Sequence, residues 1–400
     1  PLPNSSELTR FAHSEESGAA AALVAKCLML AALTVVEQTL HTRHRPPSGV
    51  RHVEVPRRLI SARDALRHAK VCESWRKAGE GAHGHTAALR ALCAVHTFDH
   101  LEVVWRMSQT GGGFDTDTYC APGSWEAMLD GTSAWLEATV LAAAMEGPAL
   151  ALSRPAGHHA TQNVAMGFGL VNFAAAAVQA HLTSHPTSTV AILDWDVHHG
   201  NGVAAIFREE PRVRYASTHE AGGFPGTGMR EDERGPLGNL LNLPLPKGSG
   251  GDIFLAALRQ KALPFLLAPA ASSDTAASRD TASRDATRDA SRGATPQDAA
   301  ACWEAPPGLL LVCAGYDALE SDPLATMSLR PEDFAAAVRM IVDEWGYPAE
   351  RVALGLEGGY DLDSESGMPA GLVATCRALV ETFKWVGDFV SRLAARLTCV

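Results

Sequence analysis

The chain has 400 residues, of which 46% are hydrophobic and 20% are charged, and its formal net charge is −11. This content is sufficient for one large α/β domain. The acidic balance argues against nucleic-acid binding, because contact with phosphates needs a basic surface patch. The eight cysteines include no CxxC pair, which favours a reduced, intracellular protein over a disulfide-bonded one.

The first 50 residues are predicted to form a helical extension that ends in a cluster of proline and glycine at residues 44–49. An apolar stretch at residues 19–36 contains Lys26, so we expect a packed helix of a soluble protein and no membrane span. A globular domain then occupies residues 51–400. Its first helices are expected at residues 61–68, 87–97 and 124–145.

Five short apolar runs are expected to be buried strands, and each is followed directly by polar residues. Helical patterns lie between most of them, as at residues 173–181 and 331–344. This alternation predicts an α/β fold with a mainly parallel sheet and helices on both faces. Ligands bind such sheets beyond the carboxyl ends of the strands, where the polar clusters fall. The five runs are residues 149–153, 190–193, 213–216, 309–313 and 352–356.

Residues 271–299 interrupt the pattern. They are rich in Ala, Ser, Thr, Asp and Arg, contain near-repeats of Ser/Thr-Arg-Asp, and have almost no large apolar side chain. Such a composition cannot bury a core, so we expect a disordered surface insertion within the domain.

A metal site is indicated by Asp196 and His198, which follow the strand at residues 190–193. Residues two apart at the end of a strand face the same way, so both side chains can reach one ion. Asp317, after the strand at residues 309–313, is the natural third ligand. Catalytic zinc takes imidazole nitrogen and carboxylate oxygen from three residues and leaves a position open for water.

A pair of histidines, His158 and His159, lies at the same expected edge of the sheet. An imidazole near neutral pKa beside a metal-bound water is the expected general acid and base. Tyr360 follows two glycines, which permit a close approach, and its phenol could donate to an oxyanion. Phe168 and Phe224 lie in glycine-rich loops, where each alone is more typical of a core residue.

Six segments together form a specific signature: RPAGHHA, MGFGLVNF, VAILDWDVHHGNG, GGFPGTG, CAGYDALESDPLA and LEGGYDL. In this order they resemble the histone deacetylase family, on its class II and acetylpolyamine amidohydrolase-like branch. The resemblance covers roughly residues 52–379 apart from the insertion, and it implies the arginase/deacetylase fold. The family's usual His-Pro-Glu is here His52-Val53-Glu54, and no first strand is evident before it.

The resemblance implies catalytic roles residue by residue. Asp196, His198 and Asp317 match the zinc ligands, and Tyr360 matches the tyrosine that polarises the substrate carbonyl. The histidine pair matches the catalytic dyad. Asp194 and Asn201 match the residues that orient this dyad. A structural potassium ion is also implied, held chiefly through backbone carbonyls by Asp194, Asp196, His198, Ser217 and Thr218.

The resemblance also implies a tunnel for acyl-lysine. Phe168 and Phe224 match its two aromatic walls, and Gly167 matches its backbone acceptor. Leu324 matches the gatekeeper, which is acidic in polyamine-preferring relatives, so leucine favours acyl-lysine. Three further residues are placed with less direct matches: Asp117 or its rival Asp115 at the rim, and Arg58 near the acetate exit.

Together these features predict a zinc-dependent deacylase acting on N6-acetyl-lysine in histone or non-histone proteins, with neither nucleic acid nor membrane as a direct partner. His159 is expected to take a proton from water and Tyr360 to stabilise the oxyanion. Three alternatives remain. The first is a deacylase of acetylpolyamines or other small amides, and the second is a non-catalytic scaffold that binds acyl-lysine. The third is an arginase-like two-metal enzyme, for which VHHGNG lacks the aspartate-rich spacing.

Overall fold

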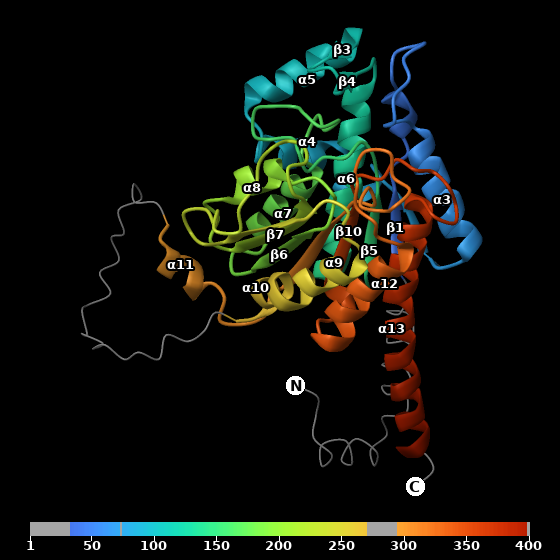
Figure 1. The fold of residues 1–400 in the computed structure, drawn as a ribbon, viewed down its shortest axis with the longest axis vertical. Coiled ribbons are helices and arrows are strands. Elements are labelled where there is room, and N and C mark those ends of the chain that lie inside the picture. The colour runs from blue at the N-terminus through green and yellow to red at the C-terminus, as the bar shows by residue number, and fades with distance from the viewer. Residues whose placement is uncertain (1–32, 73, 270–293, 398–400) are drawn as a thin grey trace.

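A single eight-stranded parallel sheet forms the centre of the computed structural model, which describes residues 33–72, 74–269 and 294–397 (Figure 1). The strands stand in the order β2-β1-β5-β10-β9-β6-β7-β8. Their bounds are β1 Thr34–Glu37, β2 Ser74–Lys77, β5 Ala149–Leu152, β6 Val190–Asp194, β7 Val213–Glu220, β8 Leu240–Leu245, β9 Leu309–Ala314 and β10 Val352–Leu356. A small antiparallel pair, β3 Gly112–Gly113 and β4 Tyr119–Cys120, lies apart from it.

Helices cover both faces of the sheet, as the sequence predicts. Successive residues of a strand point to opposite faces, so Leu150 and Leu152 belong to one hydrophobic core and Ala149 and Ala151 to the other. Helices α3, α9, α10, α12 and α13 pack in the first core, and α4 to α8 in the second. The helices are α3 Arg57–Ala69, α4 His85–Cys93, α5 Phe98–Thr110, α6 Ser124–Ala143, α7 Phe173–Ser184, α8 Asn201–Phe207, α9 Gly251–Ala257, α10 Leu263–Leu267, α11 Pro296–Ala301, α12 Pro331–Arg339 and α13 Met368–Leu397.

The predicted helical extension over residues 1–50 is wrong where the structure describes it. Residues 34–37 form β1, which is the second strand from one edge of the sheet and pairs with β2 and β5. The domain therefore begins before residue 51. The two apolar residues of this short strand, Val35 and Val36, continue the longer apolar stretch before it, so the sequence pattern does not distinguish the strand from the end of a helix. Leu33, just before the strand, is buried, and residues 19–32 of the stretch lie outside the described residues.

The predicted insertion at residues 271–299 is also corrected at its end. Residues 270–293 lie outside the described part of the chain, but residues 296–301 form α11. The Thr295 hydroxyl accepts a hydrogen bond from the backbone N–H of Asp298, and the Asp298 carboxylate accepts one from the backbone N–H of Thr295, which together form a capping box. This motif, with Pro296 in the first turn, explains the helix.

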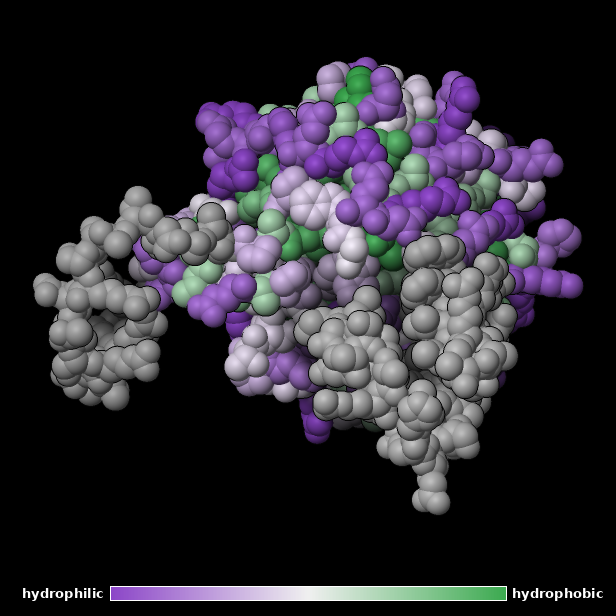
Figure 2. Space-filling view, turned by 90° about the horizontal axis from the view of Figure 1, so that it is seen from below, coloured by the Kyte–Doolittle hydropathy of each residue, from purple (hydrophilic) through white to green (hydrophobic). Residues whose placement is uncertain are grey.

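Polar side chains are prominent on one face of the domain. On the face shown in Figure 2, hydrophilic residues surround small areas of apolar ones. Among the helices that the structure describes, none combines the length and the hydrophobicity needed to cross a lipid bilayer.

Candidate active site

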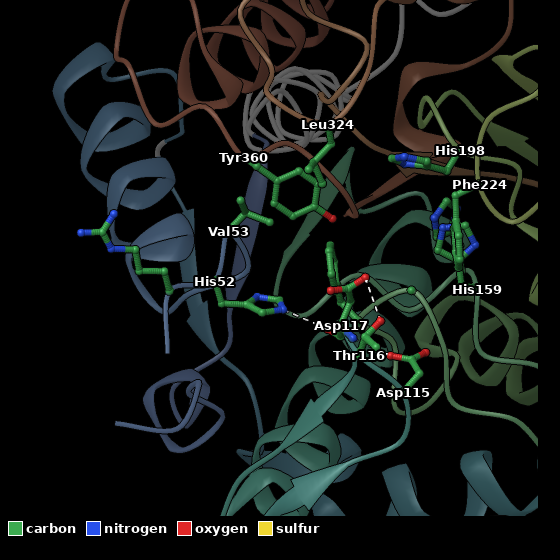
Figure 3. A pocket seen from close by; sticks show the side chains of 14 residues that line it. His52, Val53, Asp115, Thr116, Asp117, His159, His198, Phe224, Leu324 and Tyr360 are labelled. Atoms are coloured by element: carbon green, nitrogen blue, oxygen red, sulfur yellow. Dashed lines mark hydrogen bonds between the residues drawn. The ribbon is translucent and has the colours of Figure 1, made fainter. Parts of the chain in front are cut away.

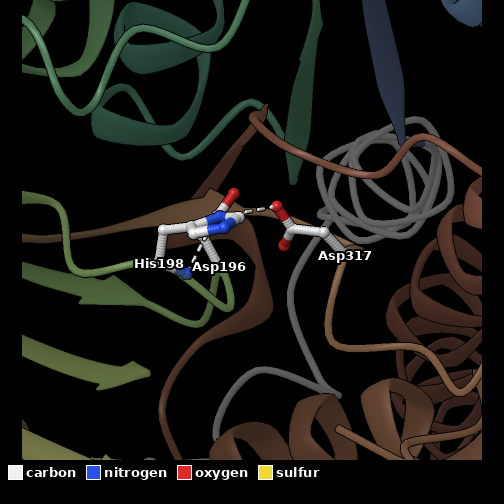
Figure 4. A group of neighbouring side chains, drawn as sticks. All are labelled: Asp196, His198 and Asp317. Carbon is white, nitrogen blue, oxygen red and sulfur yellow. Dashed lines mark hydrogen bonds and ion pairs between the residues drawn. The ribbon is translucent and has the colours of Figure 1, made fainter. Parts of the chain in front are cut away.

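Three side chains meet at the carboxyl ends of β6 and β9 (Figure 4). One ligand atom of each of Asp196, His198 and Asp317 lies within 4.8 Å of the others. Nδ1 of His198 is 3.2 Å from Oδ1 of Asp196 and 3.1 Å from Oδ2 of Asp317. Backbone amides orient the carboxylates: Gly358 donates to Asp196 at 2.8 Å and Val197 donates to Asp317 at 3.0 Å. A Cβ atom at Gly358 would overlap the Asp317 carboxylate, so only glycine fits there.

The donor set of this triad is consistent with Zn²⁺. Both carboxylates are fully buried, and within the described ranges neither forms an ion pair with a lysine or arginine. Burial and the charge of Asp196 raise the pKa of Asp317. Two buried carboxylates without a lysine or arginine as counter-charge are costly, and a bound cation would offset that cost. Imidazole nitrogen with carboxylate oxygen is a set that zinc accepts, and three protein ligands leave a position open.

The histidine pair lies beside the triad, and a different residue holds each ring. Nδ1 of His158 is 3.1 Å from Oδ2 of Asp194, which also accepts from the Tyr215 hydroxyl at 2.9 Å. Nδ1 of His159 donates to Oδ1 of Asn201 at 2.8 Å. The Asn201 amide nitrogen in turn donates to the backbone oxygen of His159 at 3.3 Å. With its Nδ1 proton held in this way, a neutral His159 has an unprotonated Nε2 that can accept a proton.

The two rings have opposite electrostatic surroundings, although their centroids are 4.0 Å apart. Burial opposes a charge on His158, but the carboxylates of Asp196 and Asp194 outweigh it and raise the pKa of His158 to about 10. Burial, with the positive fields of His158 and His198, lowers the pKa of His159 well below its usual value. Groups whose pKa values are driven apart in this way can serve as a separate acid and base.

A pocket of ≈ 590 Å³ opens onto the histidine pair (Figure 3). The Tyr360 hydroxyl points into it, across from Phe224 and His159. Burial raises the pKa of Tyr360 well above its usual value, so the phenol stays protonated and can donate. The Phe168 and Tyr360 rings meet edge to face at 5.4 Å, and those of Phe224 and His159 at 4.9 Å. The other predicted lining residues also contribute to the wall, namely Gly167, Leu324, Asp115 and Asp117.

The geometry separates the two candidates for the rim aspartate. The Asp115 carboxylate accepts from the backbone amides of Asp117 and Thr118, at 2.8 and 2.5 Å, and from the Thr118 hydroxyl at 3.0 Å. Its acceptor positions are therefore used within its own turn. The exposed Asp117 carboxylate meets only the Thr116 hydroxyl, at 3.4 Å, in the described contacts. Of the two carboxylates, that of Asp117 is therefore the one available to accept hydrogen bonds from another molecule, and its role at the rim stays a prediction.

The residues of the implied potassium site lie together on neighbouring strand ends. Asp194 of β6 pairs with Ser217 of β7 in the parallel register, and Asp196, His198 and Thr218 follow these positions along the chain. The Thr218 hydroxyl is buried without a partner in the described structure. Potassium binding stays a prediction.

Glu357 supports the site but had no role in the sequence interpretation. The Glu357 carboxylate accepts from the backbone amides of Gly157 and His158, at 2.6 and 3.2 Å, and so holds the histidine loop. Burial raises the pKa of Glu357 to about 8. Its only sequence signal is its position directly after a buried strand. Arg58, placed near the acetate exit by resemblance, lies behind Tyr360 with its guanidinium 4.6 Å from the centre of the phenol ring.

The fold and the site together define a hydrolase of the arginase/deacetylase fold, and comparisons with known proteins assign the family. The histone deacetylase domain model matches residues 52–270 and 283–376. A histone deacetylase-like amidohydrolase of Pseudomonas aeruginosa is 33% identical over 349 residues, which are 81% of this chain and 76% of that protein. A probable deacetylase of Methanothermobacter thermautotrophicus is 32% identical over 282 residues, covering 69% and 72%.

An uncharacterized protein of Synechocystis is also similar, with 34% identity over 343 residues, or 85% of this chain and 95% of that one. Among solved structures, the HDA15 HD domain superposes with a TM-score of 0.68 at 26% identity and covers 92% of this chain and 97% of that chain. The chain therefore belongs to the histone deacetylase family. At the level of the family, these matches support a deacetylase or amidohydrolase activity.

Proposed function

We propose that this chain hydrolyses the acyl amide of N6-acetyl-lysine in proteins, with Zn²⁺ held by Asp196, His198 and Asp317. The observation that carries the proposal is a neutral base beside the metal triad: the ring centroid of His159 is 5.9 Å from that of His198, and both rings line the same pocket. When bound, Zn²⁺ supplies Lewis-acid activation of a water and of the substrate carbonyl.

The side chains of this site have separate tasks in that reaction. His159 accepts the proton of the attacking water at Nε2, because Asn201 holds the proton on Nδ1. The Tyr360 hydroxyl donates to the oxygen that becomes negative in the transition state. A protonated histidine of the pair then gives its proton to the departing amine. His158 remains charged beside Asp194 and stabilises negative charge nearby.

The walls of the pocket support a lysine side chain as the substrate group. Phe168, Phe224 and Leu324 provide apolar surface for an alkyl stem whose polar atoms lie at its end. By the resemblance of its motif, Leu324 matches the gatekeeper position, where an acidic residue would be expected in a polyamine-preferring relative. The exposed carboxylate of Asp117 at the rim suits the amide N–H groups of a peptide backbone.

A substrate comparison with metal content measured on the same sample tests the proposal. We expect zinc-loaded protein to hydrolyse an acetyl-lysine peptide with a higher kcat/KM than acetylspermidine. Leu324→Glu is expected to shift this ratio toward acetylspermidine, and the apolar control Leu324→Met is expected to leave it nearly unchanged. A wild-type preference for acetylspermidine would establish the polyamine alternative. Full zinc occupancy without turnover of either substrate would favour a non-catalytic scaffold.

A further inference from the structure

The segment of residues 322–326 lies between two loops of the pocket, and carboxylates fasten it at both ends. At its first end, Oδ2 of Asp322 accepts from the backbone amide of Tyr360 at 2.6 Å and from that of Asp361 at 3.3 Å. Oδ1 of the same carboxylate accepts from the amide of Leu324 at 3.0 Å. Asp322 is only 6% exposed, and these three backbone amides are the hydrogen-bond donors to its carboxylate among the described residues. One carboxylate therefore joins the tyrosine loop to the gatekeeper.

At the other end of the segment, Thr326 donates twice to Glu220. Its backbone amide and its hydroxyl reach Oε2 of Glu220 at 2.8 and 2.6 Å. Glu220 is the last residue of β7 and is 7% exposed. Its backbone oxygen accepts from Gly223, so it also begins the loop that carries Phe224. The segment thus bridges two walls of the pocket.

Leu324 stands in the middle of this bridge and is 38% exposed toward the pocket. Figure 3 shows it beside the ring of Tyr360. A movement of the Asp322 carboxylate would displace the backbone of both Leu324 and Tyr360. Loss of the contact between Thr326 and Glu220 would release only the part of the segment that carries Leu324. The two ends of the bridge therefore have separable effects.

We propose that Asp322 is a positioning residue that sets where the Tyr360 hydroxyl and the Leu324 side chain stand relative to each other, with Glu220 as the second anchor of the bridge. This inference rests on the proposed function of the pocket. In Asp322→Asn, one acceptor oxygen is replaced by an NH₂ group that faces an N–H donor, so one of the two loops loses its anchor. A displacement of about 1 Å at a catalytic group can cost about 10²-fold in rate.

Kinetics with Asp322→Asn and Tyr360→Phe, singly and together, test the role in catalysis. We expect Asp322→Asn to lower kcat by about 10- to 100-fold in the wild-type background, and by less than about threefold when Tyr360 is already phenylalanine, because Asp322 acts through the phenol. Thr326→Val is expected to raise KM and to leave kcat nearly unchanged. An equal loss of kcat in both backgrounds would overturn the proposal.

Asp363→Asn is a matched control. Its carboxylate also accepts from nearby backbone amides, those of Glu365 and Ser366, but it is exposed and lines no wall of the pocket. Hydrogen exchange measured by mass spectrometry gives a readout that needs no turnover. Exchange in peptides spanning residues 322–326 and 357–361 should rise in Asp322→Asn and not in Asp363→Asn. Unchanged exchange in both peptides would overturn the proposal, whereas an inactive wild type would count only against the proposed function.

Discussion

Replacing Glu54 by glutamine is expected to destabilise the protein strongly, because this carboxylate neutralises two buried arginines. Oε1 of Glu54 accepts from Nε of Arg154 at 2.7 Å and from Nη1 of Arg58 at 3.3 Å. Oε2 accepts from Nη2 of Arg154 and from the Tyr119 hydroxyl. All three charged side chains are fully buried. Glutamine would leave both guanidinium groups in the interior without a counter-charge.

The size of the effect follows from this burial. Removing one partner of a buried ion pair costs roughly 3–5 kcal/mol, because the remaining charge stays out of water. Glu37→Gln is the matched control: Glu37 also meets two arginines, Arg63 and Arg67, but these partners are partly exposed. Exposed pairs contribute about 0.2–1 kcal/mol. Urea unfolding, followed by circular dichroism and fluorescence, measures both free energies of unfolding. Equal losses in the two variants would refute the reasoning.

The same contact predicts how stability depends on pH. Burial opposes ionisation of Glu54, but the charges of Arg154 and Arg58 hold the pKa of its carboxyl well below the usual range. Its contribution is therefore complete above the unfolded-state pKa of about 4.3, and it is lost as pH falls below that value toward the lower folded-state pKa. The difference in stability between wild type and Glu54→Gln should shrink below about pH 4.

Three further changes act on the site itself. Tyr360→Phe is expected to lower kcat by about 10²- to 10³-fold with metal content unchanged, since one donor to the oxyanion is lost; unaltered turnover would contradict this role. Asp194→Asn should move the alkaline limb of the kcat/KM profile to lower pH, because the Asp194 carboxylate helps to raise the pKa of His158. A chelator should abolish turnover and lower the melting temperature of the wild type. The loss in free energy of unfolding is expected to be about 2.7 kcal/mol relative to protein with free metal at 100 Kd. Asp317→Asn should show little of this shift in melting temperature.

The sequence predicts the central strands well and the remaining strands poorly, for a physical reason. Strands β5, β6, β9 and β10 are inner strands buried on both faces, so each is a short apolar run that ends in polar residues. Strand β2 lies at the edge of the sheet with no fully buried residue, and β8 contains Pro244. Neither strand is an uninterrupted apolar run in the sequence, because β2 is mostly polar and Asn242 and Pro244 interrupt the leucines of β8.

The site could be predicted in part because its chemistry requires particular residue types. Two carboxylates and an imidazole at neighbouring strand ends form a set of ligands that zinc accepts, so their types alone indicate a candidate site. The contacts of Asp322 and Glu357 have no such signature, because their partners are backbone amides, which every residue except proline offers. Tyr360 is 38 residues from Asp322, and Gly157 is 200 residues from Glu357.

The pair of Glu54 and Arg154 does join two specific residue types, yet it is equally hidden in the sequence. With 45 acidic and 34 basic residues in the chain, opposite charges 100 residues apart do not identify partners. The fold brings this pair together because Arg154, just after the end of β5, contacts the segment that carries Glu54. Both side chains are buried there, and a buried charge is strongly destabilising unless it is paired. The groups proposed to touch the substrate are therefore specified by residue type, whereas those that hold them in place depend on the three-dimensional path of the chain.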